Sequence, residues 1–491
     1  MSIRPNQVHM KLRCRTWALL FAALFAAVSW AQQSPPPSPP AQAAPAPPSA
    51  SAPATTPDAD FFKAADDVLA EMSKLLSMPI LRPVKKSVRS REEIRAYLLA
   101  QEKKEKDSAK DYADQRALEM FGLLPKDFPL EQTLNDILTE QIAGLYDPDA
   151  QEFYISDWTS PDELRMVMAH ELTHALQDQH YHIDAWRDAA KPNDDAELAR
   201  DSVLEGAAVA AMLDYMLRDQ GKGVRDLPAI DPSMVVGDAD SSPELSKAPM
   251  VIRDELLFPY LAGTVFTQQV LKATRGWPDF GSVFANPPAS TQQIMHPDLY
   301  LQGVTCAPVK LPDFSALLPA DWKQLDENLM GEFGVLEILK QFLKEPDAES
   351  LAASWAGDRY AIFENQQTKQ DLLIFRLRLT SDTEAARFFD YYSDVLESKD
   401  ATRTNLFRRP NFFSFDTPAG GVFLRCYKSE CLSAEGATRD IFDRITHAIA
   451  WPAVQAPGTP APPADSDSAP LTITFVPPAA TDPSLAAAPS H

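Results

Sequence analysis

The sequence predicts an α+β protein with a mainly helical part that contains a small sheet (59–330), followed by an α/β sandwich (331–451). Long apolar–polar runs of helical period and without breakers dominate the first part. A strand–turn–strand pattern interrupts them near 145–155. After residue 331, helical runs alternate with short apolar strands, which is typical of a mostly antiparallel sheet covered by helices.

The first 31 residues are expected to be a secretory signal. An apolar run at 17–28 follows a basic segment, and Ser29-Trp30-Ala31 places small residues before a cut at Gln32. The basic residues are Arg4, Lys11, Arg13 and Arg15. This pattern predicts an exported protein, either periplasmic or secreted.

Two proline-rich segments flank the folded part. Residues 32–58 and 452–491 each hold ten of the 43 prolines. Segments of this composition bury too little apolar area to offset chain entropy, so both are expected to be disordered spacers.

The charge balance excludes some classes of partner. With 69 Asp+Glu against 46 Lys+Arg, the formal net charge is −23. Such an acidic chain is unsuited to general nucleic-acid binding, which needs a basic surface. No run reaches the ~20 apolar residues of a spanning helix, so no stable membrane insertion is expected after signal cleavage. The partner expected instead is a protein or peptide substrate.

Three cysteines remain after the expected signal. Cys426 and Cys431 flank a turn-like tetrapeptide and are placed to bridge a hairpin, which would leave Cys306 free or paired elsewhere. Three reduced, buried cysteines are the alternative.

In the first part, helices are expected at 61–76, at 90–121 and at 131–146, the last ending near Gly144. The hairpin 145–155 turns at Asp147-Pro148-Asp149-Ala150. Ser160 and Glu163 then form a capping box that opens a helix over 161–182.

A polar loop at 190–195 leads into a second strong helix at 196–217. Residues 219–250 are expected to be a loop, and helical patterns return at 252–275 and 290–297. In the second part we expect strands at 359–364, 371–380, 411–416 and 421–428, with helices at 332–344, 347–354, 382–398 and 438–449.

The helix at 161–182 carries His170-Glu171-Leu172-Thr173-His174, in a chain with only 8 histidines. Residues at i and i+4 project from one helix face, so the two imidazoles can bind one Zn²⁺. Glu171 is placed to take a proton from a zinc-bound water. Two structural histidines with an incidental Glu are the alternative.

A catalytic zinc needs a third protein ligand. Glu205 is the preferred candidate, because it lies on the next helix among apolar residues, 31 positions after His174. Asp201, one turn earlier, is either an acceptor for a ligating imidazole or part of a solvated acidic face. His180 is the alternative ligand, but in an unbroken helix it points about 80° away from His170 and lies ~9 Å beyond His174.

Other side chains are weaker candidates. His296 could steady an oxyanion, with a structural hydrogen bond as the alternative. Tyr146 and Tyr154 either line the substrate edge or pack in the core. Asp358 and Arg359 are interpreted as a local ion pair.

Several runs together resemble a group of exported bacterial zinc metallopeptidases of poorly defined function. The matching runs are residues 140–148, HELTHALQDQ at 170–179, Leu204-Glu205-Gly206, residues 290–297 and residues 355–360. More broadly, the chain resembles zincins of the gluzincin branch. The resemblance implies a zincin core, with His170, His174 and Glu205 as zinc ligands and Glu171 as general base.

The function expected from these features is zinc-dependent hydrolysis of peptide bonds outside the cytoplasm, with one Zn²⁺ per chain. The alternative is a non-catalytic exported scaffold that keeps a zincin core and binds a partner through residues 331–451.

Overall fold

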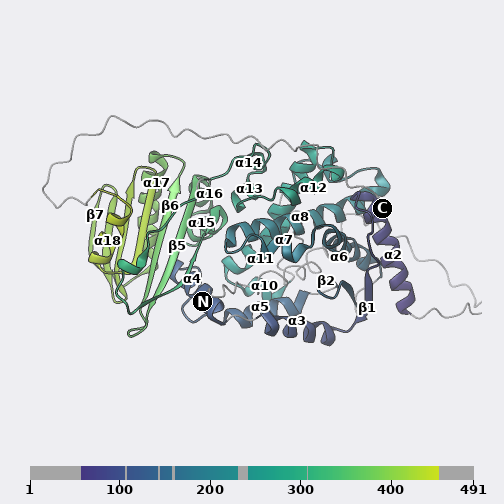
Figure 1. The fold of residues 1–491 in the computed structure, drawn as a ribbon, viewed down its shortest axis with the longest axis horizontal. Helices are drawn as coiled ribbons and strands as arrows, with labels where there is room; N and C mark the ends of the chain where they lie inside the picture. The colour runs from purple at the N-terminus through teal and green to yellow at the C-terminus, as the bar shows by residue number, and fades with distance from the viewer. Residues whose placement is uncertain are drawn as a thin grey trace, which may run out of the picture.

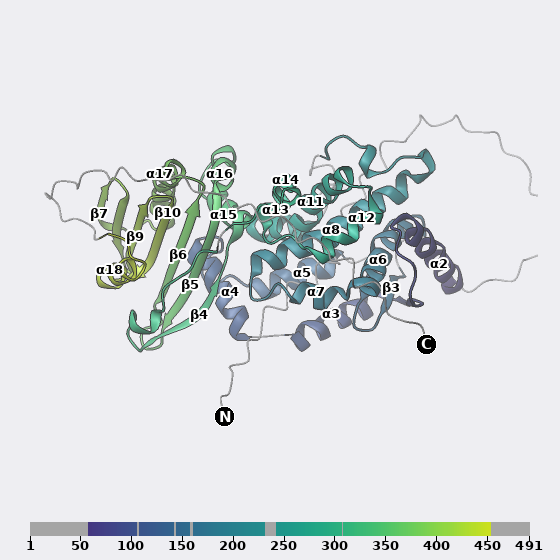
Figure 2. The same cartoon turned by 45° about the horizontal axis from the view of Figure 1, so that its top comes forward.

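The computed structural model describes residues 57–105, 108–141, 144–157, 161–230, 242–306 and 308–452. The expected signal, nearly all of both proline-rich segments and the expected helix cap Ser160 lie outside these ranges. Figures 1 and 2 show a helical part beside a sheet, with α15 where the two meet. The predicted α+β class is confirmed: the first part is helical with a three-stranded sheet, and the second has a seven-stranded antiparallel sheet.

The helical part is built from twelve α-helices and three strands among the described residues. They are α2 (Pro57–Leu75), β1 (Lys85–Arg89), α3 (Arg91–Glu105), α4 (Ser108–Phe121), α5 (Leu130–Gln141), β2 (Gly144–Asp147), β3 (Glu152–Ser156), α6 (Pro161–Tyr181), α7 (Ile183–Asp188), α8 (Asp194–Leu217), α10 (Pro243–Lys247), α11 (Met250–Ala273), α12 (Trp277–Ala285), α13 (Thr291–Met295) and α14 (Pro297–Leu301). The predicted hairpin is β2–β3, and the predicted helices at 161–182 and 196–217 are α6 and α8.

Several boundaries differ from the prediction. The expected helix at 131–146 ends at Gln141, because Gly144–Asp147 is a strand. Lys85–Arg89 is a strand that pairs in parallel with β3, and the sequence analysis missed it. The run KKSVR is short and charged, so only its pairing with β3 reveals it. The expected helix at 290–297 is split at His296, since Pro297 starts α14. Residues 219–250 are not a loop throughout, because they include α10 and two 3₁₀ turns.

The second part contains β4 (Trp322–Asn328), α15 (Gly331–Lys340), α16 (Glu345–Ala352), β5 (Trp355–Asn365), β6 (Asp371–Leu379), α17 (Asp382–Lys399), β7 (Thr404–Arg409), β8 (Phe412–Thr417), β9 (Gly420–Tyr427), β10 (Glu430–Ala437) and α18 (Arg439–Ala448). The strand order is β4-β5-β6-β10-β9-β8-β7. β4, β7 and β10 were not predicted from the sequence. β4 lies before residue 331 but pairs with β5 in this sheet.

Strand alternation places apolar side chains on both faces of this sheet. On β6, Leu373, Phe375 and Leu377 join the core beneath α17, whereas Leu372 and Ile374 join the core beneath α18. Both faces are therefore buried at Leu372–Phe375, which explains the continuous apolar run there, whereas the end of the strand alternates with Arg376 and Arg378.

The two parts share one core. Phe121 of α4 contacts Phe375 of β6, with ring centroids 5.3 Å apart. Asp358 of β5 accepts hydrogen bonds from the backbone N–H groups of Met330 and Gly331, at 2.8 and 3.0 Å, and so holds the start of α15. α15 in turn contacts α8 and α13 of the helical part. The sheet therefore has fixed packing contacts with the helical part.

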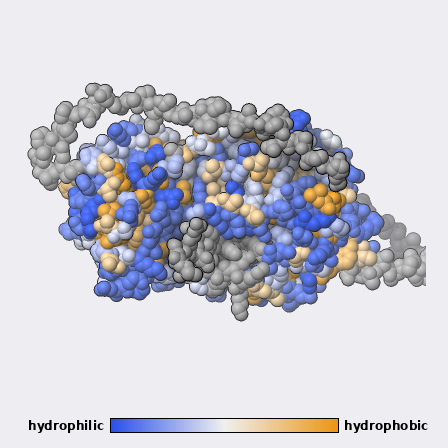
Figure 3. Space-filling model, viewed as in Figure 1, coloured by the Kyte–Doolittle hydropathy of each residue, from blue (hydrophilic) through white to orange (hydrophobic). Residues whose placement is uncertain are grey.

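Two features, the described helices and the cysteines, bear on the expected location outside the cytoplasm. The face in Figure 3 is mainly hydrophilic, with apolar side chains in scattered patches. No described helix is long and apolar enough to cross a membrane. Cys426 and Cys431 form a disulfide across the β9–β10 hairpin, and Cys306 is a free thiol. Disulfides are typical of oxidising compartments outside the cytoplasm.

Candidate metal centre

The helix α6 carries the histidine pair through the interior of the helical part. Buried apolar residues of α6, among them the i, i+4 stripe Leu164, Met168, Leu172 and Leu176, face a core to which α2, α8 and the small sheet contribute. His170 and Glu171 are 0% exposed, so the polar residues of the motif are buried together with this apolar surface. Burial of three ionisable groups on one helix needs partners that compensate the lost hydration.

Glu205 of α8 faces the two imidazoles. Its Oε2 lies 3.2 Å from His170 Nε2 and 3.3 Å from His174 Nε2, and the two Nε2 atoms are 3.1 Å apart. At Zn–ligand distances of roughly 2.0–2.1 Å, tetrahedral coordination separates ligand atoms by about 3.3 Å. The three donor atoms have this spacing, and the buried group could hold a metal ion.

Glu171 lies beside this group but does not belong to it. Its Oε2 accepts a hydrogen bond from the backbone N–H of Tyr146 on β2, at 2.8 Å. Its Oε1 is buried and has no hydrogen-bond partner among the described residues. One carboxylate oxygen is thus anchored, and the other is available to accept a proton or a hydrogen bond.

Gln177 orients His174, a role that the sequence analysis did not assign. His174 Nδ1 lies 2.9 Å from Gln177 Oε1, so Nδ1–H donates and Nε2 is left as the electron-pair donor. Gln177 Nε2 in turn donates to the carbonyl of Leu204, beside Glu205, at 3.3 Å. The i,i+3 spacing of the two residues on one helix was the available signal.

Asp201 is buried, so it is not part of a solvated acidic face. The guanidinium of Arg187 lies close to it, with Nη1 3.7 Å from Asp201 Oδ1. Asp201, one turn before Glu205 on α8, therefore compensates the charge of the buried Arg187.

Tyr260 of α11 is a second residue that the sequence analysis missed. Its ring is fully buried and stacks on His170, with centroids 6.3 Å apart and planes 24° apart. Burial, followed by the charges of Glu205 and Glu171, raises the pKa of its phenol. Nothing in the apolar sequence around Tyr260 reveals this contact, because α11 is brought to the site only by tertiary packing.

Burial and mutual charge set the pKa values in the group. Burial raises the pKa of Glu171 to about 8 and lowers that of His170 to about 4. For Glu205, burial is outweighed by the neighbouring histidines, which lower its pKa to about 2. For His174, burial is outweighed by the charge of Glu205, which raises its pKa to about 9. Glu205 and His174 therefore form a charged pair, and a metal ion bound here would replace the His174 proton.

The remaining candidates lie outside this group. His180 Nε2 is 2.9 Å from the carbonyl oxygen of Pro79. His296 Nε2 is 2.7 Å from Glu332 Oε1, which agrees with the structural alternative. The hydroxyls of Tyr146 and Tyr154 donate to Asp178 and Asp147, and both rings are buried in the core. Arg359 pairs with Glu327, so the expected ion pair between Asp358 and Arg359 is wrong.

Part of the chain matches a known protein family. Residues 320–444 match a domain of unknown function, DUF8575, which covers the seven-stranded sheet and most of its helices. No curated protein matches the chain. No solved structure matches it either.

Proposed function

We propose that this chain is a zinc-dependent peptidase that acts outside the cytoplasm. The observation that carries the proposal is the buried His170–His174–Glu205 group with Glu171 beside it. This is the donor set of a catalytic rather than a structural zinc site, since three protein ligands leave one coordination position open. The resemblance to gluzincins supports the same assignment.

His170, His174 and Glu205 would hold the ion. Two neutral imidazoles and one carboxylate are ligands that suit zinc. A bound zinc ion supplies a Lewis acid that polarises a carbonyl and lowers the pKa of water. A purely structural site would have no use for a carboxylate in the position of Glu171.

Glu171 would act as the general base. Its Oε2 is held by the Tyr146 N–H, which fixes the direction in which the free Oε1 points. Oε1 would take the proton of the attacking water and later deliver it to the leaving amine.

Replacing Glu171 with glutamine tests this role. The amide side chain keeps the shape and the hydrogen-bond acceptor for Tyr146, but it cannot take a proton. We expect about one zinc per chain by elemental analysis in both proteins, and a loss of peptide hydrolysis by 10²-fold or more in Glu171→Gln.

Two results would contradict the proposal. Full peptide hydrolysis by the Glu171→Gln variant would exclude Glu171 as the general base. Bound zinc without hydrolysis of a broad peptide library by the unaltered chain would favour the scaffold alternative.

A further inference from the structure

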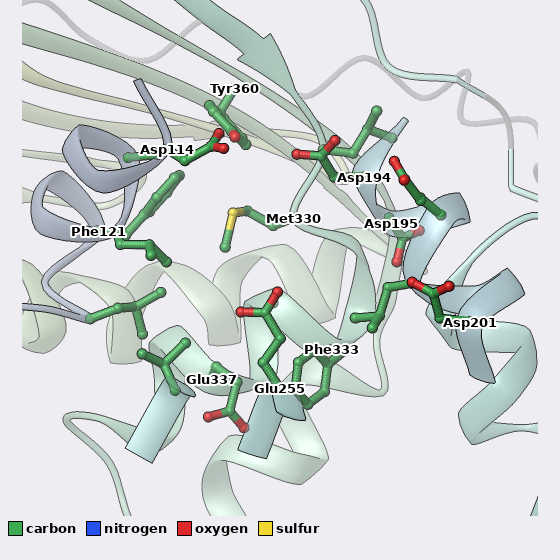
Figure 4. A pocket seen from close by; sticks show the side chains of 18 residues that line it. Asp114, Phe121, Asp194, Asp195, Asp201, Glu255, Met330, Phe333, Glu337 and Tyr360 are labelled. Carbon is green, nitrogen blue, oxygen red and sulfur yellow. The ribbon is translucent and has the colours of Figure 1, made fainter. Parts of the chain in front are cut away.

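A pocket lies where the helical part meets the seven-stranded sheet. Its walls come from α4, α8, α11, α15 and β5 (Figure 4). The apolar lining includes Phe121, Met330 and Phe333. This pocket is separate from the three metal-binding side chains, none of which lines it.

The pocket is strongly acidic. Four of its carboxylates come from α8: Asp194, Asp195, Glu197 and Asp201. Three more come from α4, α11 and α15: Asp114, Glu255 and Glu337. No lysine or arginine is among the lining residues, although these carboxylates have four basic neighbours behind the walls: Lys110, Arg187, Lys191 and Lys340.

Two buried carboxylate oxygens in the lining lack a donor. Asp195 Oδ1 accepts from the backbone N–H and the hydroxyl of Thr291, but Oδ2 has no hydrogen-bond partner among the described residues. Glu337 Oε1 is 3.1 Å from Lys340 Nζ, whereas Oε2 has no partner within the described part of the chain. Asp195 and Glu337 are 4% and 1% exposed. A buried, ionised carboxylate oxygen without a donor is costly, so in their ionised form both groups favour a ligand that brings N–H groups.

The lining suits an organic cation better than a metal ion. Across the described residues, the metal group on α6 and α8 is the sole set of three ligand atoms that converge closely enough for an ion. The pocket carboxylates are spread around apolar walls instead, and Figure 4 shows Glu255 reaching up between them towards Met330. A long aliphatic stem with a cationic head fits this arrangement, because the stem contacts the apolar walls and the head meets the carboxylates.

The pocket adjoins the metal group along α8. Glu197 and Asp201 line the pocket, and Glu205 continues the same i, i+4, i+8 stripe. One turn of helix, a rise of about 6 Å, separates Asp201 from Glu205. A peptide bound at the metal group would therefore lie about one helical turn from Asp201, which lines the pocket.

We propose that this pocket binds a lysine or arginine side chain of the peptide substrate, so that cleavage selects peptides with a basic residue near the scissile bond. The inference rests on the proposed peptidase function and adds a substrate class to it.

The test uses the zinc-loaded full chain and pairs of peptides that differ only by arginine or citrulline, placed in turn at each position around the cleaved bond. Citrulline keeps the length and the hydrogen-bonding head but has no charge. We expect kcat/KM to favour arginine by about tenfold or more at one position, as charge complementarity predicts. Glu255→Gln and Glu337→Gln should bring this ratio close to one. The control is Glu384→Gln on α17, outside the pocket, which should keep the wild-type ratio.

The outcomes separate the two proposals. Cleavage of both peptides with a ratio of one at every position, or a ratio that neither pocket variant changes, would overturn the inference and keep the peptidase function. If neither peptide is cleaved, the peptidase function fails, and fluorescence anisotropy with the same peptides and Glu171→Gln measures the pocket directly. Tighter binding of the arginine peptide, lost on combining Glu171→Gln with Glu255→Gln, would support the pocket; equal binding of both peptides would overturn it.

Discussion

Gly206 of α8 and Gly263 of α11 bring two buried helices into backbone contact. A Cβ atom added to Gly206 would lie 2.6 Å from Gly263 Cα, and one added to Gly263 would lie 3.1 Å from Gly206 Cα. Gly206 directly follows the metal-binding Glu205, and α11 carries Tyr260, which stacks on His170. The close approach of these helices therefore fixes the distance between two walls of the metal group.

Gly206→Ala should separate the helices and destabilise the protein. The added methyl meets backbone atoms of Gly263 that cannot rotate away, so we expect a loss of about 3 kcal/mol in the free energy of unfolding. Chemical denaturation measures this loss. Gly334→Ala is the control, since its nearest atoms belong to the flexible Met330 side chain; equal losses in both variants would contradict the packing argument.

Glu205→Ala should abolish zinc retention, whereas His180→Ala should keep it. Glu205 supplies one of three converging donor atoms, but His180 hydrogen-bonds the carbonyl of Pro79. Elemental analysis after dialysis against a weak chelator distinguishes the two. Zinc retained in Glu205→Ala and lost in His180→Ala would reverse the ligand assignment.

Gln177→Ala should weaken zinc binding without removing a ligand. Without its acceptor at Nδ1, the His174 ring loses the contact that fixes its tautomer and orientation, and we expect about 10–100-fold lower zinc affinity. Competition with a chromogenic chelator measures the affinity. Gln177→Glu keeps an acceptor oxygen and should therefore keep most of the zinc affinity. Equal weakening of zinc binding by Gln177→Ala and Gln177→Glu would mean that Gln177 does not act through His174.

Glu337→Gln should change how stability depends on pH. Burial, followed by the charge of Asp254, raises the pKa of Glu337 to about 7. Between its ordinary value of 4.5 and about 7, the folded protein holds a proton that the unfolded chain has released, so wild-type stability falls as pH rises. The Gln variant lacks this pH-dependent loss. As the pH rises from 5 to 8, its free energy of unfolding should therefore increase by on the order of 2 kcal/mol relative to that of the wild type.

Urea unfolding at pH 5, 6, 7 and 8 measures the pH effect. Glu384→Gln should follow the wild-type profile. A constant difference between wild type and Glu337→Gln across this range would show that Glu337 titrates in the folded protein as it does in the unfolded chain.

The Cys426–Cys431 disulfide should contribute about 2 kcal/mol, because it closes a loop of only a few residues. The double variant Cys426→Ser, Cys431→Ser should lose this amount in denaturation experiments. Thiol titration of the denatured chain after signal cleavage should find one free thiol, Cys306. Three free thiols would show that the bridge does not form in the exported protein.

The local sequence predicted the elements that carry the metal group. HELTH lies in a long run without breakers, and helical geometry alone places His170 and His174 on one face. Glu205 was identified as the third candidate because a carboxylate among apolar residues needs a partner. The hairpin β2–β3 was predicted by its turn residues, whereas the short charged strand β1 was not, since its pairing partner lies 67 residues away in sequence.

Only the tertiary structure decided what surrounds these residues. Residue spacing along the chain does not reveal which helices pack together. The stacking of Tyr260 on His170 and the glycine contact between α8 and α11 could therefore not be predicted from the sequence. The acidic pocket likewise joins α4, α8, α11, α15 and β5, which are scattered from residue 108 to residue 365. Helical periodicity and helix caps depend on residues that are close in sequence, whereas packing depends on surfaces that come together only when the chain folds.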